Sequence, residues 1–115
     1  MQRGDIVLVD LPQAAGASGH EQTGNRPALV VHSDATSANL SIIMIVPLTS
    51  NLTAKQFPHT VEIQPSKQNG LSMLSVLLVF QLRAIDKRRI LKKLGVIEAP
   101  LLDQVTAEIK KMLEI

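Results

Sequence analysis

Hydrophobic and polar residues form short patterned segments along most of this 115-residue chain. Residues 5–11, 28–33 and 42–48 are rich in β-branched side chains, which favour extended strands. Residues 42–48 are all apolar, so we expect that strand to be buried on both faces. In residues 59–65 apolar and polar positions alternate, which is typical of a strand with one exposed face. These patterns predict four short strands in the first part of the chain.

The pattern changes toward the C-terminus. Residues 71–85 predict one long strand, bent near Ser75, and residues 86–95 predict a turn with a short strand. After Pro100, which suits the first turn of a helix, apolar residues recur at helical spacing. The predicted buried positions are Leu102, Val105, Ile109, Met112 and Leu113, and the outward positions are Asp103, Glu108, Lys110 and Lys111.

Five or six strands followed by one helix predict a mainly β, α+β fold. We expect a small, strongly bent sheet or partial barrel that the C-terminal helix closes. Parallel βαβ units are excluded because no crossover helices separate the strands. The length suits one domain, and neither a repeat nor a linker interrupts it, so we expect residues 1–115 to form a single domain.

Composition narrows the class of protein. The chain has no cysteine, which excludes disulfides and thiolate metal sites. The N-terminal segment lacks the features of a signal peptide, and the apolar runs are far shorter than the roughly 20 residues of a membrane span. We therefore expect a cytoplasmic protein with no membrane association.

Positive charge is concentrated in one segment. Six of the twelve basic residues lie between Arg83 and Lys93, where Asp86 is the one acidic residue. Such a cluster suits a phosphate-binding surface. From the cluster alone, a solvated turn and strand edge is an equally good interpretation. The six residues are Arg83, Lys87, Arg88, Arg89, Lys92 and Lys93.

The three histidines do not predict a metal site. His20, His32 and His59 are far apart and lack the spacing of metal ligands, so no metal and no cofactor is expected. We interpret His32 as a residue at the end of a strand and His59 as a surface residue.

The most reactive side chains lie in the loop "GHEQTGNRP", residues 19–27. Loops of this kind carry function because a rigid scaffold aims them. Arg26 lies directly before a proline, which partly presets its backbone. Thr49 and Ser50 follow a buried strand where it meets a loop. Taken alone, a surface ion pair would explain Arg26, and a turn cap would explain Thr49.

Four segments in this order resemble the MazF/PemK/Kid toxin family: "RGDIVLVDL", "G-x-EQ-x-G-x-RP-x-LV", "VPLTS" and "FQLRAIDKRRI". The resemblance covers nearly the whole chain, from Arg3 to the C-terminal helix. It implies an SH3-like barrel, a homodimer, and a sequence-specific endoribonuclease that cleaves single-stranded RNA without a metal. It also implies a cognate antitoxin protein that blocks the RNA groove. Operator DNA, bound by the toxin–antitoxin complex, is a further candidate partner.

The resemblance also assigns residues. Arg26 matches the family's catalytic arginine, Thr49 its catalytic threonine and Glu21 its loop glutamate, while Gln22 and Gln81 match positions near the RNA groove. The loop between the first two strands is a few residues longer than usual, and His20 stands where a serine is common. Further candidates for contact with RNA are Asn25, Ser50, Arg83 and Lys87.

The chemistry of RNA cleavage supports this reading independently. When the 2′-OH attacks the adjacent phosphate, the reaction needs a base, an acid and donors for the developing charge. Arg26 offers a planar set of donors for phosphate oxygens, and Thr49 adds a hydroxyl. An arginine holds its proton too tightly to be a good shuttle. Glu21 or His20 is therefore the better candidate for the general base.

Two alternatives come from other functional classes. One is a CcdB-like toxin on the same barrel, which inhibits gyrase and has no catalytic pair. The other is a non-catalytic nucleic-acid-binding barrel that uses the basic cluster. The joint presence of "GNRP" and "PLTS" favours the ribonuclease. Phe57 and Phe80 are the only aromatic residues, and neither is an evident base-stacking platform, so we expect RNA contacts through hydrogen bonds and arginine planes.

Overall fold

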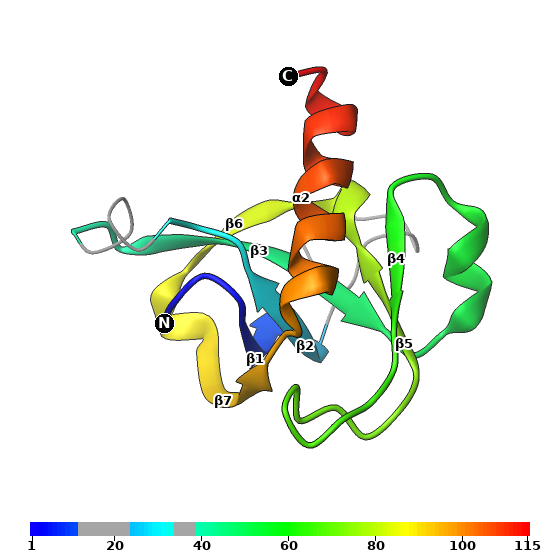
Figure 1. Ribbon diagram of the computed structural model, residues 1–115. Coiled ribbons are helices and arrows are strands. Elements are labelled where there is room, and N and C mark those ends of the chain that lie inside the picture. Colours follow the sequence, from blue (N-terminus) through cyan, green and yellow to red (C-terminus); the bar gives the residue numbers. More distant parts are fainter. Residues whose placement is uncertain (12–23, 34–38) are drawn as a thin grey trace.

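The computed structural model describes residues 1–11, 24–33 and 39–115. This part of the chain forms a seven-stranded sheet, three short 3-10 helices and one C-terminal α-helix (Figure 1). The strands are β1 (Asp5–Leu11), β2 (Gly24–Val30), β3 (Ile42–Thr49), β4 (Thr60–Ile63), β5 (Ser75–Leu78), β6 (Arg83–Asp86) and β7 (Ile90–Val96). The helices are η1 (Leu52–Gln56), η2 (Val79–Gln81), η3 (Lys87–Arg89) and α2 (Ala99–Leu113).

Strand β3 organises the sheet because it pairs with three strands, β2, β5 and β6. All pairings are antiparallel, and the order is β4-β5-β3-β2-β1-β7, with β6 also paired to β3. Residues 42–45 of β3 pair with β6, whereas residues 48–49 pair with β5. Among the described strands the order does not return from β7 to β4. The sheet of the described strands is therefore open, which agrees with the partial barrel expected from the sequence, and the SH3-like barrel implied by the resemblance is not closed.

Alternating side chains place buried residues on both faces of the central strands. On β2, Leu29 belongs to one core cluster, while Ala28 and Val30 belong to another. This alternation follows from the two-residue period of a strand. The Leu29 cluster also contains Val105 of α2. Helix α2 packs against β4 and η2, and Figure 1 shows it beside β4. The helix thus covers one face, and the mainly β, α+β class predicted from the sequence is confirmed.

Two predicted strand boundaries are wrong. Strand β2 begins at Gly24, so the segment that holds Arg26 is part of the sheet and not of a loop. The long strand predicted for residues 71–85 is shorter and divided: the chain bends at residues 72–73, close to the expected bend near Ser75, and η2 separates β5 from β6. The division lets the two strands pair with different halves of β3, which raises the strand count to seven.

Helix α2 agrees with its predicted pattern except at two positions. Pro100 lies in the first turn, and Val105 is fully buried. Leu113, which we predicted to be buried, is 53% exposed because the last turns of the helix extend away from the sheet (Figure 1). Glu108, predicted to face outward, is partly buried and bonded to His59. The part of the chain that the structure describes has no helix long and apolar enough to cross a membrane.

Candidate active site

Arg26 and Thr49 line the same pocket, which has a volume of about 330 Å³. The sheet explains why they meet. Ala28 of β2 is the register partner of Pro47 of β3, and two residues further along these antiparallel strands come Arg26 and Thr49. The predicted pair, separated by 22 intervening positions in sequence, is therefore brought together by strand register. Asn25 and Ser50, both predicted to contact RNA, line this pocket as well.

The hydroxyl of Thr49 has a structural role in addition to its place in the pocket. Thr49 is 6% exposed, and its Oγ1 accepts a hydrogen bond of 3.1 Å from the backbone N–H of Asn51. A hydroxyl that accepts one hydrogen bond still has its own proton to donate. The turn cap that we considered as an alternative therefore does not compete with donation to a substrate.

A third segment, residues 70–75, supplies part of the pocket lining. Gly70, Leu71, Ser72, Met73 and Ser75 contribute to this lining, and Leu94 of β7 adds to it. Sequence reasoning missed this segment as part of a site. The only sequence feature near this segment is "SKQNG" at residues 66–70. Its residues favour a turn, and a turn predicts only a change of chain direction.

The other described candidates lie elsewhere on the fold. Gln81 is the last residue of η2, Arg83 is paired with Ile45 in the ladder between β3 and β6, and the backbone N–H of Lys87 bonds to Ser41. None of these three is among the residues that line the Arg26–Thr49 pocket. His20, Glu21 and Gln22 lie outside the described residues, so their roles stay predictions.

Carboxylates balance part of the basic cluster. Arg88 forms a 3.0 Å ion pair with Asp86, Arg89 lies 3.7 Å from Asp10, and Lys93 lies 3.3 Å from Asp5. Hydrogen bonds from Arg88 lower the pKa of Asp86 below its ordinary value. The segment is therefore a mixed-charge surface at these positions, as the interpretation of a solvated turn and strand edge implied.

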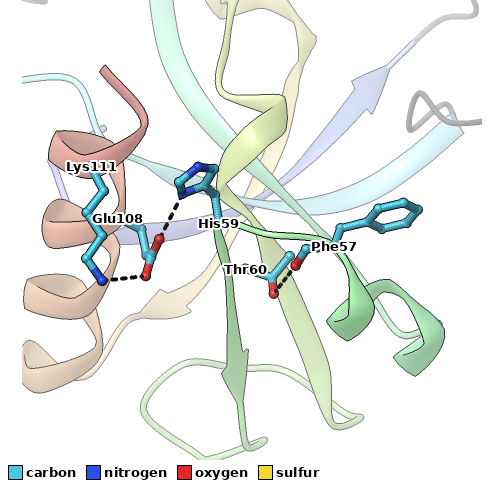
Figure 2. A network of polar contacts seen from close by, with 5 residues as sticks. All are labelled: Phe57, His59, Thr60, Glu108 and Lys111. Atoms are coloured by element: carbon cyan, nitrogen blue, oxygen red, sulfur yellow. Dashed lines mark hydrogen bonds and ion pairs between the residues drawn. The ribbon is translucent and has the colours of Figure 1, made fainter. Parts of the chain in front are cut away.

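His59 is not the simple surface residue that we predicted. Figure 2 shows its ring pointing toward Glu108 of α2, with Nδ1 3.0 Å from a carboxylate oxygen. Because a carboxylate only accepts, Nδ1 is the donor. His59 also has a left-handed backbone, with φ of 57°. The described residues include no group of three or more side chains suited to hold a metal ion.

The two phenylalanines lie together, which the sequence did not indicate. The ring centroids of Phe57 and Phe80 are 5.5 Å apart, and the rings are inclined by 49°. Phe57 is 40% exposed, and Phe80 packs on a small cluster that includes Val76. Val76 is the register partner of Thr49, so this aromatic pair rests on the strand that borders the pocket.

Comparison with known proteins identifies the family of this chain. Residues 2–113 match the family model described as "PemK-like, MazF-like toxin of type II toxin-antitoxin system". The chain belongs to this family. Endoribonuclease MazF of Staphylococcus saprophyticus is 34% identical to this toxin over 94 residues, which cover 82% of this chain and 75% of that protein.

Further relatives extend the match over the full length of the toxin. Endoribonuclease EndoA of Bacillus subtilis is 31% identical over 105 residues, covering 91% of this chain and 87% of the relative. The crystal structure of MazF from Deinococcus radiodurans has a TM-score of 0.78 at 28% identity and covers 100% of this chain and 97% of its own. A MazE–MazF structure from the same organism has a TM-score of 0.74 at 28% identity and covers 100% and 96%. These matches confirm the fold and the family implied by the sequence motifs.

Proposed function

We propose that this toxin is an endoribonuclease that cleaves single-stranded RNA without a metal and is neutralised by a cognate antitoxin. The observation that carries the proposal is the pocket in which Arg26 and Thr49, from two different strands, lie together. The named activity of the relatives from S. saprophyticus and B. subtilis supports it. The MazE–MazF neighbour supports the antitoxin as a partner.

The proposed reaction is an internal transfer at phosphorus. The 2′-oxygen of the ribose attacks the adjacent phosphate and its proton passes to a base, while the bond to the 5′-oxygen breaks and that oxygen takes a proton from water. The products are a 2′,3′-cyclic phosphate and a 5′-OH end. Arg26 donates hydrogen bonds to the phosphate oxygens as their charge rises, and the hydroxyl of Thr49 donates a hydrogen bond to the same oxygens.

The proton acceptor is the least constrained part of this mechanism. We assign it to Glu21 or His20, which precede Arg26 on the chain. A carboxylate or an imidazole near neutral pH accepts a proton far more readily than a guanidinium does. Comparing pH–rate profiles of Glu21→Gln and His20→Ser with that of the wild type identifies the base, because its loss removes one limb of the profile.

The two alternative functions have less support. The CcdB-like gyrase inhibitor lacks a catalytic pair, whereas this pocket has the residues for one, and the matched relatives are endoribonucleases. The non-catalytic nucleic-acid-binding barrel relied on the basic cluster, but Arg88, Arg89 and Lys93 have carboxylate partners. We further propose that the toxin acts in the cytoplasm as a homodimer, and that Asn25 and Ser50 contact RNA beside the scissile bond.

The decisive experiment is cleavage of single-stranded RNA by the purified toxin in EDTA. We expect cleavage with the ends given above, and we expect a 2′-deoxy substitution at the scissile nucleotide to stop it. Arg26→Ala should lower the rate on the order of 10²–10³-fold, as the loss of one charge-stabilising donor does elsewhere. Thr49→Val, which keeps the shape of the side chain, should lose somewhat less.

Matched controls lie outside the pocket. Arg88→Ala removes an exposed arginine bonded to Asp86, and Thr53→Val removes an exposed hydroxyl bonded to Asn51. Both should cleave at close to the wild-type rate. Activity that needs magnesium, or an Arg26→Ala variant as active as Arg88→Ala, would contradict the proposed mechanism.

A further inference from the structure

The turn at residues 66–71 is held by a buried side chain, that of Asn69. This asparagine is fully buried, and its side-chain amide is hydrogen-bonded to four residues. The Oδ1 atom accepts from the backbone N–H groups of Ser66 and Leu71, both at 3.0 Å. The Nδ2 atom donates to the carbonyl of Gln64 at 2.9 Å and to Glu98 at 3.2 Å. All donors and both acceptor positions of the amide are thereby used.

Glu98 ties this turn to the start of α2. The Oγ of Ser66 donates a 2.6 Å hydrogen bond to Glu98 and accepts one of 3.0 Å from the backbone N–H of Asn69. The hydrogen bond from Ser66, together with that from Asn69, lowers the pKa of Glu98, so the carboxylate is ionised at neutral pH. Glu98 is 32 residues from Ser66 and 29 residues from Asn69 in sequence. These hydrogen bonds therefore form a tertiary clamp and not a local turn.

The backbone of the turn also lies directly on the end of β7. A Cβ added at Gly95 would come within 2.3 Å of the carbonyl oxygen of Gln68, and one added at Gly70 within 2.0 Å of that of Leu94. Gly70 has φ of 73°, a conformation that favours glycine. The N–H of Val96 further donates to the carbonyl of Gln68 at 2.8 Å. Close packing and hydrogen bonds therefore fix the position of this turn relative to β7.

The segment that leaves this turn lines the Arg26–Thr49 pocket. Gly70, Leu71, Ser72 and Met73 follow Asn69 directly, and all four belong to the pocket lining. Asn69 is not itself a lining residue, so it acts through its neighbours. We propose that Asn69 is a positioning residue for RNA cleavage, which holds residues 70–73 at a fixed distance from Arg26 and Thr49.

This proposal rests on the proposed endoribonuclease function and adds a requirement to it. The pocket must hold the phosphate and its flanking nucleotides so that the 2′-oxygen, the phosphorus and the 5′-oxygen are aligned. An error of about 1 Å in such alignment costs on the order of 10²-fold in rate, even when the substitution lies away from the reacting atoms. Loosening the turn should therefore lower kcat more than it raises KM.

The test compares Asn69→Ala with Gln68→Ala on an RNA oligonucleotide that carries the toxin's own cleavage site, identified beforehand from cuts in total RNA. Gln68 is an exposed neighbour whose side chain makes a single hydrogen bond, of 3.3 Å, to the carbonyl of Ile97. At a temperature where circular dichroism shows both variants to be folded, Asn69→Ala should lose about 10- to 100-fold in kcat. Gln68→Ala should stay within about twofold of the wild type.

Ser66→Ala is the second variant, in case Asn69→Ala does not fold. It removes two hydrogen bonds of the clamp and leaves the amide of Asn69 in place, so we expect a smaller loss of kcat in the same direction. Folded Asn69→Ala or Ser66→Ala protein that cleaves as fast as Gln68→Ala would overturn the proposal.

A structural readout separates this proposal from the proposed function. In ¹H–¹³C and ¹H–¹⁵N spectra, Asn69→Ala should shift the Met73 methyl and Ser72 amide signals, while Gln68→Ala should leave both in place. If the wild type does not cleave RNA, the proposed function fails, and these shifts alone decide whether Asn69 sets the position of residues 70–73. Unchanged Met73 and Ser72 signals in Asn69→Ala would refute the positioning role.

Discussion

At the scale of single residues, the bond between His59 and Glu108 joins the start of β4 to α2. The hydrogen bond from His59 lowers the pKa of Glu108 below its ordinary value of 4.5, and the nearby charge of Lys111, 3.5 Å away, adds to this effect (Figure 2). A carboxyl group whose pKa is lower in the folded state contributes stability above its unfolded pKa. That contribution is lost as the pH falls through the folded pKa.

We therefore predict that Glu108→Gln reduces the acid sensitivity of the fold. Between pH 6 and pH 3, the urea midpoint of the wild type should fall further than that of Glu108→Gln, because only the wild type loses an ionised acceptor at this position. Asp103→Asn, an exposed carboxylate change on the same helix, is the control and should follow the wild type. Equal falls for wild type and Glu108→Gln would show that the pair adds nothing to stability.

Single residues also show which parts of the site could be predicted from the sequence. Arg26 and Thr49 stand in recognisable local motifs, so their importance could be inferred without knowledge of the fold. Asn69 looks like an ordinary turn residue beside a glycine. Its contact with Glu98 spans 29 residues, and only the tertiary structure brings the two together.

At the scale of elements, α2 contributes one fully buried residue to the core, Val105, while other apolar residues of the helix pack partly buried against the same cluster. Val105 is fully buried and belongs to the core cluster beneath the helix. Leu113 belongs to the same predicted apolar pattern, but it is exposed. We predict that Val105→Ala lowers the free energy of unfolding by about 2 kcal/mol, from lost transfer energy and the cavity left behind. Leu113→Ala should change it by less than about 0.5 kcal/mol.

Urea unfolding of both helix variants beside the wild type checks this difference. Val105→Ala also gains a small amount of helix propensity, which opposes its loss of buried contacts, so a larger loss of stability for Val105→Ala reflects burial. A loss for Leu113→Ala as large as that for Val105→Ala would show that a partner covers the end of the helix in solution.

The elements also show where sequence patterns stop being informative. Strand β1 was predicted with its correct bounds because β-branched and other apolar residues dominate "DIVLVDL", and Gly4 and Pro12 stand at its two ends in the sequence. The break at η2 was missed because "VFQ" contains neither glycine nor proline. The chain turns there because β5 and β6 pair with different halves of β3, and the N–H of Phe80 bonds to the carbonyl of His59. Both causes lie outside the segment itself.

At the scale of the whole molecule, apolar side chains remain on the surface of the described chain. Ten large hydrophobic residues are exposed, among them Leu91 and Val96 on β7, which pairs with β1 alone among the described strands. An isolated chain leaves this surface in water, and a two-fold dimer is the commonest way to cover it. We therefore predict a homodimer.

Sedimentation velocity at micromolar concentration, at low and at high salt, measures the association directly. A dimer held by apolar surface should persist at high salt, because salt screens charges and does not weaken apolar contacts. A single species with the mass of one 12.5 kDa chain at both salt concentrations would contradict the prediction.

The change of partners along β3 has a consequence for how the toxin loses activity on warming. Arg26 belongs to the β1–β2 side of this strand, while Ser75 of the pocket belongs to the β4–β5 hairpin. The backbone ladder between the two groups is only two residues long, at Leu48 and Thr49, so the hairpin is held to the rest of the sheet mainly by a shared core cluster and by the turn at residues 66–71. Transient opening of a small unit requires less free energy than global unfolding. Heat inactivation should therefore begin when the turn at residues 66–71 loosens and the hairpin separates, while most of the sheet remains folded.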